Sequence, residues 1–71
     1  MLRTAEPLRT RIWTAQQLLE CAERELMRRR RYYRNRVMTR RMTPNEANVE
    51  LSRMMAIRDW LQKEAERERL L

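Results

Sequence analysis

Eight arginines crowd into the fourteen residues from Arg28 to Arg41, and no acidic residue occurs between Glu25 and Glu46. Guanidinium groups bind phosphates and carboxylates through paired hydrogen bonds, and they also stack on bases and aromatic rings. Repulsion among so many positive charges destabilises the folded chain, so a role in folding does not explain them. The segment therefore predicts a surface that binds a polyanion, made of Arg28, Arg29, Arg30, Arg31, Tyr32, Arg34, Arg36, Arg40 and Arg41.

Two kinds of partner fit such a surface. The first is nucleic acid, DNA or RNA, because arginines at nearly every phase of a helix can contact both walls of a groove or an irregular RNA surface. The second is an acidic surface on a host protein. A solvated basic face without a specific partner is the third interpretation. Tyr32 is the better candidate for stacking on a base, because Tyr33 keeps the phase of the apolar seam described below.

Residues that commonly carry out catalysis are scarce in this chain. It has no histidine, and its single cysteine, Cys21, therefore lacks a histidine partner. General acid–base catalysis commonly needs a histidine or a carboxylate in a cleft, and a structural zinc site needs several Cys or His ligands. We expect a protein that is not an enzyme, with no catalytic residues, no cofactor, no metal site and no small-molecule substrate.

Two helices must position the arginines, because the 71 residues include no glycine and only two prolines, Pro7 and Pro44. The first helix is expected over about residues 7–40. The second is expected over about residues 44–69. Its start is marked by Thr43 as N-cap, Pro44 at the first helical position and Glu46 three residues after the cap, which together form a capping box.

The turn at residues 41–43 is so short that the helices must be antiparallel neighbours. We therefore predict an all-α fold, a coiled-coil-like two-helix hairpin that forms a single domain over residues 1–71. Val37 should lie beside Ala47, and Leu19 near Ala65. The expected core is Leu19, Leu26, Tyr33, Val37, Leu51, Met54, Ile57 and Leu61.

Some apolar residues are left without cover by this hairpin. Val49, Ala56 and Trp60 form a second, weaker stripe on the second helix, and the start of the longer first helix extends beyond the reach of the second. A homodimer in the form of a four-helix bundle would cover both regions, whereas isolated surface aromatics on a monomer are the alternative. The candidate protein interface is Leu8, Ile12, Trp13, Val49, Met55, Ala56 and Trp60.

After the arginine run, the segment from Arg29 to Ile57 shows a spaced set of residues: Tyr33, Val37, Arg41, Met42, Thr43, Ala47, Glu50, Leu51, Met54, Ala56 and Ile57. In this pattern the segment resembles a small family of phage and prophage proteins. Members share a basic run, a Tyr, a Val four residues later, and then the pattern R-M-T-x-x-x-A-x-x-E-[IL]-x-x-M-x-A-I. Where family members often have Pro and Gly, this chain has Arg34 and Arg40. Arg34 should leave the first helix unbroken. A left-handed Arg40 would cost on the order of 1 kcal/mol more than glycine, so a different turn geometry is expected.

This resemblance implies a phage or mobile-element origin and a hairpin fold, without a mechanism. The expected function is that of a small phage-type accessory protein that binds nucleic acid electrostatically, with little sequence specificity. The alternative is a phage-encoded inhibitor or adaptor, for example in anti-defence or host takeover, that docks on a host protein complex. No apolar run approaches the roughly 20 residues that span a bilayer, so we expect no membrane association and a cytoplasmic location in a bacterial host.

Overall fold

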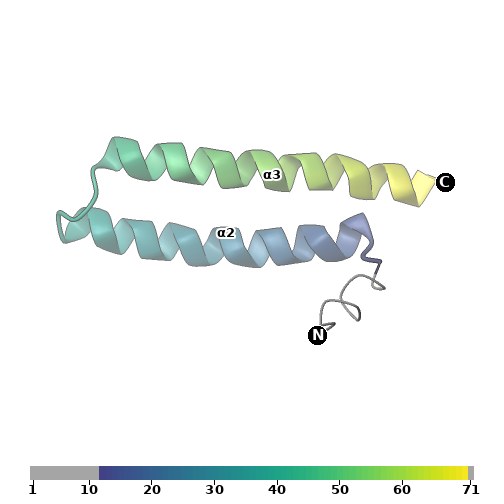
Figure 1. Ribbon diagram of the computed structural model, residues 1–71, viewed down its shortest axis with the longest axis horizontal. Helices are drawn as coiled ribbons and strands as arrows, with labels where there is room; N and C mark the ends of the chain where they lie inside the picture. Colours follow the sequence, from purple (N-terminus) through teal and green to yellow (C-terminus); the bar gives the residue numbers. More distant parts are fainter. Residues whose placement is uncertain (1–11, 71) are drawn as a thin grey trace, which may run out of the picture.

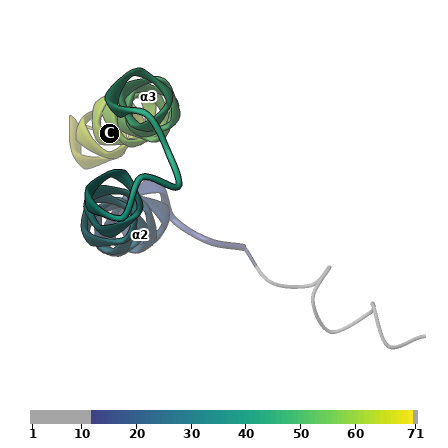
Figure 2. The same ribbon diagram turned by 90° about the vertical axis from the view of Figure 1, so that its left-hand side faces the viewer.

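The computed structural model describes residues 12–70, which form two helices joined by a short turn (Figure 1). Helix α2 spans Ala15–Met38, and helix α3 spans Pro44–Leu70. The two helices run antiparallel and lie side by side in both views (Figures 1 and 2). Residues 12–70 contain no strand. The predicted all-α hairpin of two helices is therefore confirmed.

Helix α2 begins later than the sequence analysis expected. Thr14 has an extended backbone and acts as the N-cap: its Oγ1 accepts a hydrogen bond from the Gln17 amide at 3.1 Å. The Gln17 side chain accepts one from the Thr14 amide at 2.9 Å. This capping box sets the start of α2 at Ala15. The prediction of helix over residues 12–14 is thus wrong, and the expected start near Pro7 lies outside the described residues.

Helix α3 begins as predicted. The Thr43 Oγ1 accepts a hydrogen bond from the Glu46 amide at 3.1 Å, and the Glu46 carboxylate accepts one from the Thr43 amide at 2.9 Å. The turn before it does not follow the expectation, because Arg40 adopts a left-handed φ of 61°. Arg34 leaves α2 unbroken, and that helix continues to Met38.

The core is a narrow seam between the two helices. Its buried residues are alanines and larger apolar side chains: Ala15, Leu19, Ala22, Leu26, Ala47, Met54, Leu61 and Ala65. The predicted core residues Tyr33, Val37 and Leu51 are only half-buried. Placing Ile57 in the core was wrong, because its side chain is 51% exposed. A contact between only two helices covers a narrow stripe, and Ile57 lies about 60° from its centre.

A hydrogen-bonded contact between the helix ends fixes the register. The Ala15 amide donates to both carboxylate oxygens of Glu68, at 3.0 and 3.1 Å. The predicted pairing of Val37 with Ala47 would place Ala15 opposite residue 69, one position away. The same contact provides a carboxylate for an amide in the first turn of α2, where negative charge is favourable.

Over residues 12–70, neither helix combines the length and the apolar character that crossing a membrane would require.

Candidate nucleic-acid interface

The predicted arginine surface occupies the C-terminal half of α2 and the turn. Successive residues of a helix are rotated by about 100°, so Arg28, Arg31 and Asn35 lie on the side of α2 opposite to the buried Leu26. Five of the eight arginines are exposed and form no ion pair with any residue in 12–70: Arg30, Arg31, Arg34, Arg40 and Arg41. Their positive charge is therefore available to an external anion.

Two further arginines share one carboxylate. Glu25 forms ion pairs with Arg29 at 2.8 Å and with Arg28 at 3.4 Å. The hydrogen bond from Arg29 is the main cause that lowers the pKa of the Glu25 carboxyl below its ordinary value, and the same bond raises the pKa of Arg29. The Arg28 side chain stays 73% exposed. Because exposed ion pairs of this kind are weak, Arg28 can exchange Glu25 for a phosphate at small cost.

Arg36 is engaged within the hairpin. Its guanidinium lies 5.5 Å from the centroid of the Tyr32 ring and donates a hydrogen bond to the Tyr32 hydroxyl at 3.3 Å. The Tyr32 and Tyr33 rings are 5.6 Å apart at 57°. Tyr32 is exposed and Tyr33 is half-buried, in the order that the sequence analysis expected. Arg36 is thus less available than its neighbours.

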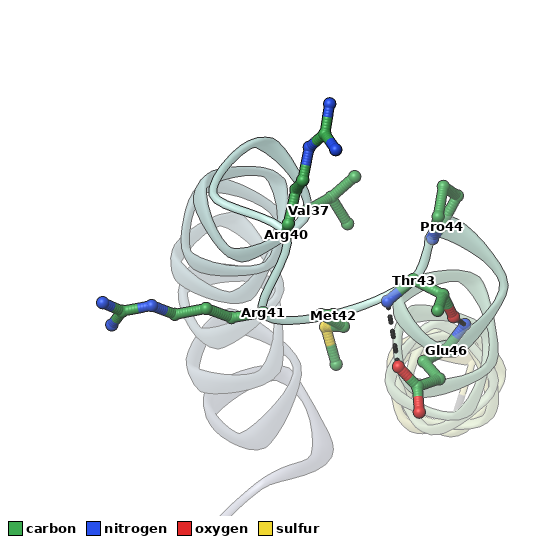
Figure 3. A pocket seen from close by; sticks show the side chains of 7 residues that line it. All are labelled: Val37, Arg40, Arg41, Met42, Thr43, Pro44 and Glu46. Carbon is green, nitrogen blue, oxygen red and sulfur yellow. Dashed lines mark hydrogen bonds between the residues drawn. The ribbon is translucent and has the colours of Figure 1, made fainter.

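The turn extends the basic surface around the end of the hairpin. Figure 3 shows Arg40 and Arg41 extending from the turn in different directions, with Val37 and Met42 between the two helix ends. The Arg41 amide donates to the Arg36 carbonyl at 2.8 Å, and the Arg40 amide donates to the Val37 carbonyl at 3.1 Å. An open hollow of about 450 Å³ lies beside these residues. The turn is therefore held by its backbone, which leaves both guanidiniums exposed.

Charge is distributed unequally along the hairpin. The half that contains the turn, residues 28–56, holds nine arginines and two glutamates. The half that contains the free helix ends, residues 12–27 and 57–70, holds five basic and seven acidic residues. The first half therefore carries a net charge near +7 and the second near −2. Within residues 12–70 a polyanion is therefore attracted to the half of the hairpin that contains the turn.

The residues predicted for a protein interface do not form one surface. Val49, Ala56 and Trp60 are exposed on α3, as the second stripe required, but Met55 is half-buried and packs against the core. Ile12 and Trp13 are exposed and precede α2 instead of extending it. Leu8 lies outside the described residues.

Sequence reasoning missed three exposed residues that belong to these surfaces. Arg24 lies one helical turn before Arg28 and extends the outer arginine row of α2. Leu18 and Ile57 are exposed although both are large and apolar. For Leu18 the available signal was its angular offset from the seam, which a count of helical phase finds. For Ile57, which lies closer to the seam, phase alone does not decide between burial and exposure.

Among residues 12–70, no group of three or more His, Cys, Asp and Glu side chains is placed to hold a metal ion. Cys21 is exposed, as expected from its distance to the seam.

Comparison of the chain with protein-family models, with curated proteins and with solved structures gives no match. The resemblance to phage and prophage hairpin proteins stays a prediction.

Proposed function

We propose that this protein is a phage-type accessory protein that binds nucleic acid, with little sequence preference, through the outer side of α2 and the turn. The observation that carries the proposal is the set of exposed arginines without ion pairs within residues 12–70: Arg30, Arg31, Arg34, Arg40 and Arg41. Arginines on such a surface would contact the phosphates of a nucleic-acid strand. Phosphate contacts do not depend on the base sequence, so we expect little sequence preference. We also propose that two hairpins associate as a homodimer.

The arrangement of the arginines favours a phosphate backbone over a single anion. Arg24, Arg28 and Arg31 follow one side of α2 over two helical turns, a distance of about 10 Å along the axis. Arg34 lies next to this row, and the turn continues it past the end of the helix. A row of charges of this length fits successive phosphates of a nucleic-acid strand, whereas one carboxylate or phosphate would use only part of it.

Charge reversal of Arg31 tests this proposal. Arg31→Glu should weaken binding of a fluorescent 20-nucleotide DNA or RNA by at least tenfold in an anisotropy titration at low salt. The matched control is Lys63→Glu, which changes the net charge by the same amount at an exposed position on the other half of the hairpin. It should change the affinity less than threefold, because Lys63 is on α3 and is not part of the arginine surface on α2 and the turn.

Salt dependence gives an independent reading of the same interface. If about four phosphates are neutralised on duplex DNA, the logarithm of the binding constant should fall with a slope near 3.6 against the logarithm of salt concentration. Arg31→Glu should lower this slope by about one. The proposal is wrong if the unmodified protein binds neither DNA nor RNA at low salt, or if Lys63→Glu weakens binding as much as Arg31→Glu does.

A second candidate function is an inhibitor or adaptor that binds an acidic protein surface. The observation that favours it is Met38, which is 74% exposed beside Arg31 and Arg34 at an open hollow of about 450 Å³. Methionine side chains repack easily against different partners, and arginine with exposed apolar groups is typical of protein interfaces. In this case Met38→Ala should weaken capture of a host protein while leaving nucleic-acid affinity unchanged.

A further inference from the structure

Large apolar side chains stay exposed along one side of the hairpin. From α3 they are Val49, Ile57 and Trp60, each more than two-fifths exposed. From α2 they are Leu18 and Tyr32, which are also more than two-fifths exposed. Together with Cys21 these residues are called the Trp60 face.

Helical phase shows that the members of each helix share one side. Trp60 follows Val49 by eleven residues, which is close to three full turns, and Ile57 lies one turn before Trp60. Tyr32 follows Cys21 by eleven residues and Leu18 by fourteen, close to three and four turns. Each helix therefore presents a continuous row.

Neighbouring residues of the two helices indicate that both rows lie on the same side of the molecule. Arg29 of α2 interacts electrostatically with Glu50 of α3. Arg36 of α2 lines the same open hollow as Val49 and Glu50. Since Tyr32 is one turn from Arg36, and Trp60 is three turns from Val49, the two rows flank one surface. Trp and Tyr exposed among charged residues are typical of an interface core with a polar rim.

The unequal charge along the hairpin indicates which occupant suits this face. A second copy that lies in the same direction would place two ends of net charge near +7 beside each other. Packed helices are about 10 Å apart, close to the screening length at physiological salt, so this repulsion would be felt. A second copy in the opposite direction places each basic half against the acidic half of its partner.

We propose that two copies of this chain pair through the Trp60 face in opposite directions, with the two-fold axis near Ile57. Ile57 is at the middle of the hairpin: α2 residues near Met27 lie opposite to it in the register set by Ala15 and Glu68. An axis at this position overlaps the hairpins along their whole length. The turns, with Arg40 and Arg41, then lie at the two far ends of the dimer.

Apart from Tyr32, which belongs to both, the Trp60 face uses different residues from the arginine surface of the proposed function. The outer row of Arg24, Arg28 and Arg31 lies on the side of α2 that faces away from α3, and the turn arginines project from the hairpin end. In an antiparallel dimer each far end would thus carry the turn arginines of one copy beside the free helix ends of the other, and the apolar Trp60 face would lie between the hairpins. The dimer proposal and the nucleic-acid proposal can therefore be tested separately, and either one can be wrong while the other holds.

The distance between the two turns tests the direction of pairing. A nitroxide label is attached to Asn45→Cys in a Cys21→Ser background, and pulsed electron spin resonance measures the distance between labels. Asn45 is twelve residues from Ile57, so antiparallel pairing predicts a separation of about 36 Å. Parallel pairing would give about 15 Å, the diagonal of a four-helix bundle, and would overturn the proposal.

Sedimentation tests whether this face forms the dimer. The full-length protein should sediment as a dimer, and Trp60→Glu should weaken dimerisation at least tenfold while helicity in circular dichroism is retained. Gln62→Glu, which adds the same charge on the opposite flank of α3, is the matched control and should stay dimeric. A monomeric unmodified protein, or a Trp60→Glu protein that is as dimeric as the control, would overturn the proposal. Arg31→Glu should remain dimeric.

Discussion

Arg40 carries the most unusual backbone of the described residues. It is the one non-glycine residue in 12–70 with a positive φ, at 61°. The left-handed region brings the Cβ of an L-residue close to the following carbonyl oxygen, at a cost of about 1–2 kcal/mol. The expectation that this cost would impose a different turn geometry was wrong. Three features outweigh the strain: the Arg41 and Arg40 amides find carbonyl partners, and Thr43 caps the next helix.

Substitution of Arg40 should release this strain. Arg40→Gly is expected to raise the free energy of unfolding by about 0.5–1 kcal/mol relative to Arg40→Ala, because both lose the charge and only alanine keeps the Cβ. Urea denaturation followed by circular dichroism measures the difference, with both variants at equal protein concentration. Equal stabilities would show that the left-handed turn of Arg40 is not strained in solution.

Each helix begins at a threonine that forms a capping box. Thr43 and Glu46 were recognisable because Pro44 follows the cap and an apolar stripe starts directly afterwards. Thr14 and Gln17 use the same hydrogen bonds, but Gln17 is a less conspicuous partner than a glutamate, and no proline marks the first turn. The apolar spacing upstream of Thr14 also suggested that the helix began earlier. Periodicity thus predicted that the helix exists and misplaced its start.

Removal of the first cap should destabilise the hairpin from the open end. Thr14→Ala is expected to lower the free energy of unfolding by about 0.5–2 kcal/mol, because the Gln17 amide loses its acceptor. Thr14→Ser keeps a hydroxyl and should cost less than half as much. Urea denaturation of the two variants provides the comparison. If Ser and Ala are equally destabilising, the methyl group and not the hydrogen bond stabilises this end.

The whole molecule depends on one seam of small contact area. Two antiparallel helices, their register to within one position and half of the predicted core (Leu19, Leu26, Met54 and Leu61) could be predicted from spacing and from the short turn. The exposure of Ile57 could not, because phase alone does not tell how wide a stripe the partner helix covers. The predicted arginine surface is exposed at seven of its nine positions, but the engagement of Arg36 by Tyr32 depends on side-chain packing that no sequence pattern encodes.

The dependence on the seam gives a stability prediction. Leu26→Ala should lower the free energy of unfolding by about 2–5 kcal/mol, since the Leu26 side chain is buried more completely than any other in the seam except Ala65. A domain of this length has a total stability of roughly 4–11 kcal/mol, so the variant should be largely unfolded on mild heating. Met27→Ala, next in sequence and 62% exposed, is the control and should change the free energy by less than about 0.5 kcal/mol. Similar losses for the two variants would contradict the packing described above.

Burial along the seam is graded from one end of the hairpin to the other. Near the free ends Ala15, Leu19, Leu61 and Ala65 are all buried, whereas near the turn the buried Ala47 is accompanied by seam residues that are only half-buried, such as Tyr33. Local opening requires least free energy where least apolar surface is lost, so transient separation of the helices begins at the bend. The half of the hairpin with the most positive charge is therefore also the half that can change its conformation most readily to fit a binding partner.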